Sequence, residues 1–298
     1  NCNRDEFVSI AWMVPWKSQA ETDAGLKREF ALAIVNQTSL WCFDMWGGVF
    51  KTPETMKLVA QSKKLWDRFA AQPLKTRAEV ALVVDPQSAR YINDQNAVVP
   101  QIYQGTRNKL NRLGAPFEVF SFNDLPRADL AQYRLFVFPG LFEITPEKMD
   151  VLRQHVLNNN RTALFLYAPG ISDGKSLDPS RVQAMTGTAF KTPGVNAVQR
   201  DGWKAVYVAS YADLTPALLK KAAREAGVTI YCEEEVPVYA NERLVAVHVA
   251  QGGEKTITLP VDCRQVSELY TGRTVTVKAR QFRYTLKTPD TVMFELIW

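Results

Sequence analysis

The sequence predicts a mixed α/β protein built of three consecutive parts, and three patterns support this prediction. Residues 1–74 hold a helix, one apolar strand and a second helix. Residues 75–232 alternate strands with helices, and several of these strands are apolar throughout. Residues 233–298 hold short alternating runs separated by turn residues. We therefore expect a segment that cannot fold alone, then a doubly wound parallel sheet, and then a small antiparallel β-sandwich.

The first part reads as helix, strand, loop and helix. Apolar residues recur at helical spacing over residues 21–37, and the apolar run 39–44 predicts a strand. Thr52 is a natural N-cap and Pro53 suits the first position of a second helix, which ends before Pro73. One buried strand needs neighbours on both edges, and an eight-stranded barrel takes about 250 residues. This part either docks on the later domains or is the C-terminal segment of a TIM barrel whose other strands lie outside this sequence.

The second part alternates strands and helices as a parallel sheet does. Strands are expected at residues 79–84, 117–120, 135–138, 163–167, 205–209 and 228–231, and helices near residues 98–113, 146–157 and 216–226. Fully apolar strands are typical of a sheet buried on both faces. We predict a doubly wound, flavodoxin-like sheet, the arrangement also used by class I amidotransferases.

No ligand motif accompanies this sheet. The first strand is followed by residues 85–88, Asp-Pro-Gln-Ser, which form no glycine-rich phosphate loop, so a bound nucleotide is not expected. Amidotransferase chemistry needs a Cys on a sharp turn after a strand, and the corresponding turn at residues 167–170 is Tyr-Ala-Pro-Gly. The turn therefore offers no nucleophile.

The third part has the spacing of an antiparallel β domain. Alternating runs cover residues 244–249, 256–259, 274–277 and 292–296, and glycine- or proline-containing turns separate them. This pattern predicts a small β-sandwich.

Composition excludes several classes of protein. The chain has 298 residues and a net charge of +5, without a run of like charges that would indicate nucleic-acid binding. No stretch approaches the roughly 18 apolar residues of a membrane span, and the compartment (cytoplasmic, periplasmic or secreted) stays open. The four cysteines are far apart and form no C-x-x-C, so neither a metal site nor a cofactor is expected, and their disulfide state is undecided.

Catalytic side chains are scarce. Only two histidines occur, and His155 in an expected helix and His248 in an expected strand are both read as structural. No G-x-S-x-G motif supports a Ser-His-Asp triad. Glu143 follows a strand, but it is read as a residue on the approach to the next helix.

The best candidates for ligand contact lie in the first part. Asp44 is an acid at the C-terminal end of a buried strand, where barrel enzymes place their working groups. Trp41 and Trp46 flank it, and Trp12 and Trp16 precede the first helix, so all five side chains are candidates for substrate binding. The structural alternatives are that Asp44 caps loop backbone or accepts a hydrogen bond from an adjacent strand, and that Trp12 and Trp16 pack within their loop.

Several motifs occur in the order found in a known family of enzymes. Residues 26–30 (LKREF), 40–50 (LWCFDMWGGVF) and 53–54 (PE) resemble the last barrel segment of family 42 β-galactosidase-like glycoside hydrolases. The family's flavodoxin-like trimerisation domain is resembled by residues 116–120, 124–125, 133–138, 166–170 and 186–187. Its small C-terminal β domain is resembled by residues 238–242, His248 and 269–272. The resemblance covers nearly the whole chain.

The resemblance implies a function for the parent protein. The family hydrolyses galactoside-type carbohydrates with retention, using two Glu at the ends of the fourth and seventh barrel strands, about 5–5.5 Å apart. If residues 39–44 are the eighth strand, both Glu lie outside this sequence, so no catalytic residue is assigned and the chain alone is expected to be inactive. The resemblance also implies a homo-oligomer, for which a trimer is possible. The charge pattern and the lack of a long apolar stretch predict no nucleic-acid or membrane partner.

Two other classes of function stay open. The chain could be a non-catalytic carbohydrate-binding or interaction protein in which residues 1–74 pack on the middle domain. An amidotransferase-like enzyme is the third hypothesis, and the missing Cys disfavours it.

Overall fold

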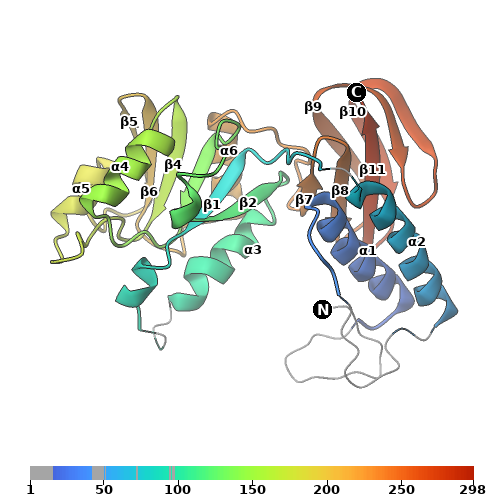
Figure 1. The fold of residues 1–298 in the computed structure, drawn as a ribbon, viewed down its shortest axis with the longest axis horizontal. Coiled ribbons are helices and arrows are strands. Elements are labelled where there is room, and N and C mark those ends of the chain that lie inside the picture. The colour runs from blue at the N-terminus through green and yellow to red at the C-terminus, as the bar shows by residue number, and fades with distance from the viewer. Residues whose placement is uncertain (1–15, 42–49, 51, 72, 94, 96–97) are drawn as a thin grey trace. The chain divides into compact units, whose positions relative to one another are not determined.

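The computed structural model describes residues 16–41, 50, 52–71, 73–93, 95 and 98–298. The chain divides into two compact units (Figure 1). Unit 1 combines residues 1–77 with 231–298, and unit 2 comprises residues 78–230. Unit 2 contains a mostly parallel sheet and unit 1 an antiparallel sheet, so the mixed α/β prediction is confirmed.

Unit 2 is built on a six-stranded sheet with the order β2-β1-β3-β4-β6-β5. Its strands are β1 (Val80–Val84), β2 (Phe117–Ser121), β3 (Leu135–Phe138), β4 (Arg161–Leu166), β5 (Val195–Arg200) and β6 (Trp203–Val208). All neighbours pair in parallel except β5, which runs antiparallel to β6 at one edge. The chain first adds β2 on one side of β1 and then adds β3 on the other, so the winding direction reverses at β1.

Both faces of this sheet are buried, as the apolar strands predict. In β3, Phe136 and Phe138 point into one core while Leu135 and Val137 point into the other. Helices α4 (Pro146–His155) and α5 (Ser180–Thr186) cover the first face, and α3 (Thr106–Leu110) and α6 (Pro216–Glu225) cover the second. A π-helical turn, η2 (Gln101–Gly105), leads into α3, and the 3₁₀ turns η1 (Ser88–Tyr91) and η3 (Phe122–Asp124) follow β1 and β2.

Unit 1 is built on a five-stranded antiparallel sheet with the order β10-β9-β11-β8-β7. The strands are β7 (Val238–Ala240), β8 (Leu244–Val249), β9 (Gly253–Glu268), β10 (Thr274–Leu286) and β11 (Asp290–Ile297). The expected strands are thus present, but they belong to one sheet and not to two separate layers. Phe282 and Tyr284 on the long β9–β10 hairpin each pack edge-on against Phe294 of β11, so the sheet encloses its own apolar core.

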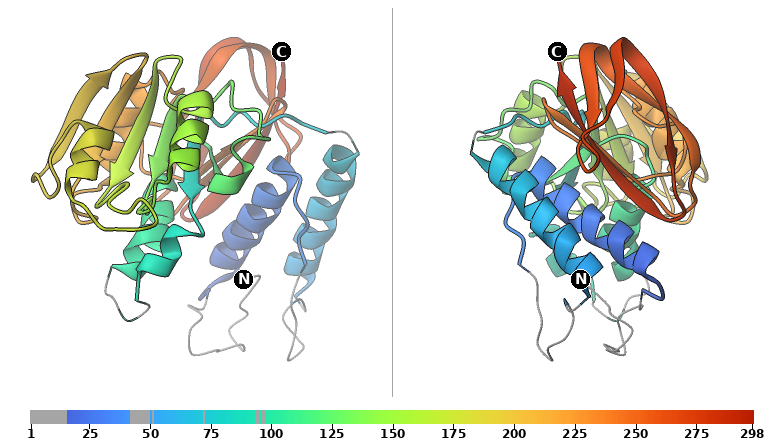
Figure 2. Two further views of the ribbon diagram at one scale, coloured as in Figure 1. Left: turned by 60° about the vertical axis from the view of Figure 1, so that its left-hand side comes forward. Right: turned by 90° about the vertical axis from the view of Figure 1, so that its right-hand side faces the viewer.

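The two N-terminal helices cover the other face of the unit 1 sheet. Helices α1 (Gln19–Val35) and α2 (Pro53–Ala70) lie side by side (Figure 2). Thr52 caps α2 by accepting a hydrogen bond from the backbone N–H of Thr55, and Pro53 begins the helix, as predicted. Phe30 and Phe69 pack with Met293 of β11, so the helices bury their apolar faces against the C-terminal strands.

An ion cluster fixes this packing. The buried carboxylate of Glu295 on β11 accepts hydrogen bonds from Arg68 of α2 at 2.7 and 2.8 Å and from Arg243 at 2.7 Å. Asn241 also donates to the last carbonyl of α1, that of Val35, at 2.8 Å. These contacts join residues far apart in the sequence into one unit.

Besides the predicted sandwich, three further details of the sequence prediction are wrong. Residues 39–41 are not in a strand, and the remainder of the predicted strand at 39–44 lies outside the described residues. Residues 228–230 connect α6 to unit 1 without strand pairing. The polar edge strand β5 and the short helix α5 have no counterpart in the prediction. Their assignment requires the neighbouring strands and helices, because neither segment has a strong apolar period.

Candidate functional site

The topology of unit 2 identifies one place where a ligand is expected. In doubly wound sheets, ligands bind outside the carboxyl ends of the strands at the point where the winding direction reverses. Here that point lies between β1 and β3. Asp85 directly follows β1, and the loop from Pro139 to Thr145 follows β3. This edge is therefore the candidate site that the fold itself supplies.

A buried ion network occupies this edge. The Asp85 carboxylate, with its side chain 1% exposed, accepts hydrogen bonds from Ser88 Oγ at 2.5 Å and from the Ser88 backbone N–H at 3.1 Å. Lys148, from the first turn of α4, donates to the same carboxylate at 2.8 Å. The Ser88 oxygen in turn accepts from the backbone N–H groups of Phe142 and Glu143 at 2.8 and 3.0 Å. The loops after β1 and β3 are thereby joined.

Glu143 extends the network toward the surface. Its carboxylate accepts from Lys148 at 3.0 Å and from the Tyr91 hydroxyl at 2.7 Å, and Ser172 donates to the Tyr91 oxygen at 3.1 Å. The hydrogen bond from Tyr91, followed by that from Lys148, lowers the pKa of Glu143. Glu143 therefore holds two loops together, a role that the sequence prediction missed.

The strand end that would carry an amidotransferase nucleophile has a strained backbone. Tyr167, directly after β4, has a φ of +63°, a left-handed conformation that is uncommon for a bulky residue. Its carbonyl accepts a hydrogen bond from Tyr207 at 2.6 Å, and its ring packs against Phe190 and Tyr211. The sharp turn is thus present, and it carries a packed tyrosine.

The contacts at this edge of the sheet suit a structural role better than a catalytic one. Each polar group described above has a partner within the network, and a satisfied network rigidifies the loops that carry it. Neither Ser88 nor Tyr91 contacts a histidine, the usual base that would activate a hydroxyl. We find no nucleophile and base pair at this edge among the described residues.

The substrate-binding candidates from the sequence lie in unit 1. Trp41 is 70% exposed, as expected for a side chain available to a ligand. Trp16 packs against Gly25 so closely that a β-carbon on Gly25 would overlap its ring, and it belongs to an apolar cluster with Leu26. Asp44, Trp46 and Trp12 lie outside the described residues. The ligand-binding role of all five stays a prediction.

The histidines occupy structural positions. His248 lies on β8, and its Nδ1 is 2.8 Å from the Thr291 hydroxyl. Because that hydroxyl donates to the carbonyl of Ala24 at 2.7 Å, Nδ1 carries the proton and donates. Burial, and next the positive charge of Arg28, lowers the pKa of His248 to about 4. His248 is therefore neutral at pH 7.

No group of three or more His, Cys, Asp or Glu side chains capable of holding a metal occurs among the residues that the structure describes. Across the same residues, no helix combines the length and apolar character needed to cross a membrane.

Comparison with solved structures gives consistent matches. A β-galactosidase from Bacillus circulans sp. alkalophilus matches 87% of this chain with a TM-score of 0.65 and 14% identity. A GH42 β-galactosidase from G. stearothermophilus, solved as a catalytic mutant, matches 96% with a TM-score of 0.63 and 13% identity. A GH42 exo-carrageenase from Bacteroides ovatus matches 94% with a TM-score of 0.50 and 15% identity.

The fold resembles that of family 42 β-galactosidases. The chain spans about half the length of the first two proteins, 48% and 58% respectively. At these identities the likeness concerns the fold. No model of a protein family matches the sequence, and no curated protein is detectably similar to it.

Proposed function

We propose that this chain forms the C-terminal part of a retaining, β-galactosidase-like glycoside hydrolase. In this role it supplies scaffold, an oligomerisation surface and one wall of the sugar site, while the two catalytic Glu lie on a barrel outside residues 1–298. The observation that carries the proposal is the match of the fold to GH42 β-galactosidases over 87–96% of this chain and only about half of theirs.

The helices of unit 1 support the sugar-site role. Asp44, Trp41 and Trp46 lie in the connection between α1 and α2, and Trp12 and Trp16 lie just before α1. The contacts of Glu295 and Asn241 fix both helices on a rigid sheet. Rigid support of this kind is what a sugar-binding loop needs, because ligand contacts are strong only when their geometry is fixed beforehand.

Unit 2 is the proposed oligomerisation domain. Both edge strands of its sheet carry an exposed valine, Val119 on β2 and Val195 on β5, with 55% and 45% of their surface accessible. Edge strands with exposed apolar side chains favour association with another chain. Native mass spectrometry of the purified chain tests this. We expect a homo-oligomer, and a strict monomer at high concentration contradicts this part of the proposal.

Activity measurements test the catalytic part. The 298-residue chain, incubated with 4-nitrophenyl β-D-galactopyranoside, is expected to show no turnover above buffer. Robust turnover that disappears when a carboxylate of this chain is changed would refute the location of the catalytic pair.

A longer polypeptide tests the sugar wall. If the coding sequence continues upstream of Asn1, the longer protein is expected to hydrolyse aryl galactosides. There, Trp41→Ala is expected to lower kcat/KM about fivefold, the effect of losing roughly 1 kcal/mol of aromatic contact. Leu177→Ala is a matched control, because Leu177 is 68% exposed and lies in unit 2. Equal effects of both substitutions would count against a sugar-contacting Trp41.

A second candidate function rests on the packing of the first two helices. α1 and α2 bury Phe30 and Phe69 within a unit made of residues from this chain, as a self-contained interaction or carbohydrate-binding module would. This candidate predicts binding of galacto-oligosaccharides by the purified chain and no activity in the longer polypeptide. Calorimetry with the chain and an activity assay on the longer polypeptide separate the two functions.

A further inference from the structure

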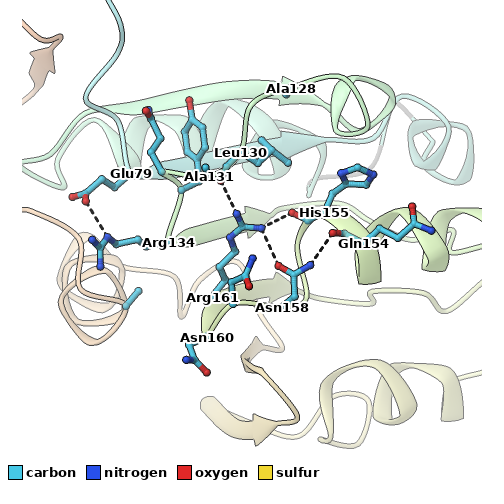
Figure 3. Close-up of a pocket in the computed structure, with 14 residues that line it drawn as sticks. Glu79, Ala128, Leu130, Ala131, Arg134, Gln154, His155, Asn158, Asn160 and Arg161 are labelled. Atoms are coloured by element: carbon cyan, nitrogen blue, oxygen red, sulfur yellow. Dashed lines mark hydrogen bonds and ion pairs between the residues drawn. The ribbon is translucent and has the colours of Figure 1, made fainter.

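Unit 2 has a pocket, which Figure 3 shows in close-up. It lies at the edge of the sheet opposite the ion network of Asp85 and Lys148. The pocket has a volume of about 740 Å³, within the usual range for small-molecule sites. Glu79 lies just before β1, Arg134 just before β3, and Arg161 is the first residue of β4, so the pocket lies at the amino ends of the parallel strands. Gln154 and His155 line it from the end of α4.

Arg161 is held rigidly in this pocket. Its Nη1 donates to the carbonyl of His155 at 2.6 Å and to Asn158 Oδ1 at 3.2 Å, and its Nη2 donates to the carbonyl of Leu130 at 2.8 Å (Figure 3). Its guanidinium also lies 5.6 Å from the centre of the Phe136 ring. The side chain is thus preorganised, and partial burial lowers the pKa of its guanidinium.

No carboxylate in the described part of the chain pairs with Arg161, although its bond to the His155 carbonyl places it at the C-terminus of α4. All three of its acceptors are uncharged oxygens, and no carboxylate lies within 4 Å of it in the described part of the chain. Glu79 is the acidic residue that lines the pocket, and Arg134 already pairs with it at 3.0 Å. The lining therefore carries two arginines against one glutamate. A partly buried cation without a counter-ion is unfavourable, and an anionic ligand would relieve this cost.

The rest of the lining suits hydroxyl groups. The side chains of Gln154, His155, Asn159 and Asn160 make no hydrogen bonds with other residues in the described ranges. Asn159 and Asn160 both adopt left-handed backbone conformations, with φ of +54° and +57°, and the Asn160 N–H is anchored to the Gly202 carbonyl at 2.7 Å. Planar amides that both donate and accept can each pair with adjacent hydroxyls.

We infer that this pocket binds a small anionic polyol, with a carboxylate, sulfate or phosphate group against Arg161 and hydroxyl groups against the neighbouring amides. The inference is independent of the proposed glycosidase role, because it uses only residues of unit 2 and no catalytic group.

Calorimetric titration of the full chain at constant ionic strength tests the ligand class. The probes are galacturonate, galactose 6-sulfate and galactose 6-phosphate, with galactose and inorganic sulfate as controls. At least one sugar anion is expected to bind about tenfold more tightly than galactose, the effect of one charge-assisted hydrogen bond. The three sugar anions distinguish which oxyanion the pocket prefers. If galactose binds as tightly as the sugar anions, the pocket does not select for an anion. If inorganic sulfate binds as tightly as the sugar anions, the pocket does not select for hydroxyl groups. If no probe binds at millimolar concentration, the whole inference is overturned.

Isosteric variants locate the binding. Asn160→Asp and Gln154→Glu each add a carboxylate to the lining without removing a buried contact, and each is expected to weaken the sugar anion about fivefold through charge repulsion. Asn123→Asp is the matched control, because Asn123 is an exposed residue in η3, after the carboxyl end of β2. Binding that is unchanged in both pocket variants, or weakened equally in the control, assigns the anion to another surface and refutes the inference.

Discussion

Replacing Lys148 with methionine is expected to destabilise unit 2 by about 3 kcal/mol. Met keeps the apolar stem but removes the cation that the Asp85 and Glu143 carboxylates share at 2.8 and 3.0 Å. Breaking a buried pair costs about 3–5 kcal/mol, mostly from the charge left behind. Asp85, 1% exposed, bears that cost in full, whereas Glu143 is 17% exposed and keeps its Tyr91 bond, which favours the lower end of the range.

For a unit of about 150 residues, a loss of this size lowers the midpoint of thermal unfolding by about 10 °C. The assay is hydrogen exchange of peptides that span β1 and β3, because it reports on unit 2 itself, measured alongside thermal unfolding of the whole chain. Lys221→Met is the control. It breaks an ion pair with Glu225 in which the side chains are 76% and 42% exposed, and it is expected to cost under about 0.5 kcal/mol.

A double variant separates the charge effect from lost packing. Adding Asp85→Asn to Lys148→Met removes the uncompensated carboxylate and leaves a side-chain oxygen for Ser88. The double variant is therefore expected to recover at least about 1 kcal/mol relative to Lys148→Met alone. Two results would show that the network does not hold the loops together. One is a double variant whose loss of stability equals the sum of the two single losses, and the other is a Lys148→Met variant within about 1 kcal/mol of the parent protein in free energy of unfolding.

Three further predictions concern unit 1. Glu295→Gln leaves two arginines without their shared carboxylate and is expected to cost about 2 kcal/mol in urea unfolding, whereas Glu254→Gln, at an exposed pair, costs little. Burial lowers the pKa of His248 from 6.5 to about 4 in the folded protein. Its contribution to the free energy of unfolding is therefore present above pH 6.5 and is lost as the pH falls toward 4. That loss reaches about 3 kcal/mol at pH 4, and His248→Gln is expected to flatten the stability profile between these values; an unchanged profile contradicts the assignment. Gly25→Ala places a β-carbon against the Trp16 ring and is expected to shift tryptophan emission to the red, and an unchanged spectrum in a folded variant shows that the ring does not pack there.

The sequence predicted best those elements that local chemistry specifies. α2, α4 and α6 each begin with a Thr-Pro pair in which the threonine caps the helix, at Thr52, Thr145 and Thr215. β3 matches its predicted range, and its four consecutive apolar residues are typical of a strand buried on both faces. The short β-branched run at residues 228–230 misled the prediction, because its propensity is that of a strand but no neighbouring strand pairs with it.

The candidate sites were harder to predict because they depend on contacts between distant residues. Asp85 and Lys148 are 63 positions apart, and nothing in either local sequence indicates that they pair. The run from Asp85 to Ser88 did carry a signal, since an aspartate often accepts hydrogen bonds from backbone N–H groups just after it in a turn, as Asp85 does from Gln87 and Ser88. Arg161 likewise reads as an ordinary first residue of a strand, and its uncharged acceptors become evident only in three dimensions.

The carboxyl edge of the unit 2 sheet bears directly on the amidotransferase-like hypothesis. An enzyme with a doubly wound sheet keeps the loops after its central strands open to ligand. Here the chain fills that position with its own Lys148, which ties Asp85 to Glu143, and the strained turn after β4 carries the packed ring of Tyr167. Such an edge gains rigidity and loses access to substrate. An amidotransferase-like enzyme would need a nucleophile and an open site at this edge, so the structure argues against that hypothesis independently of the likeness in fold.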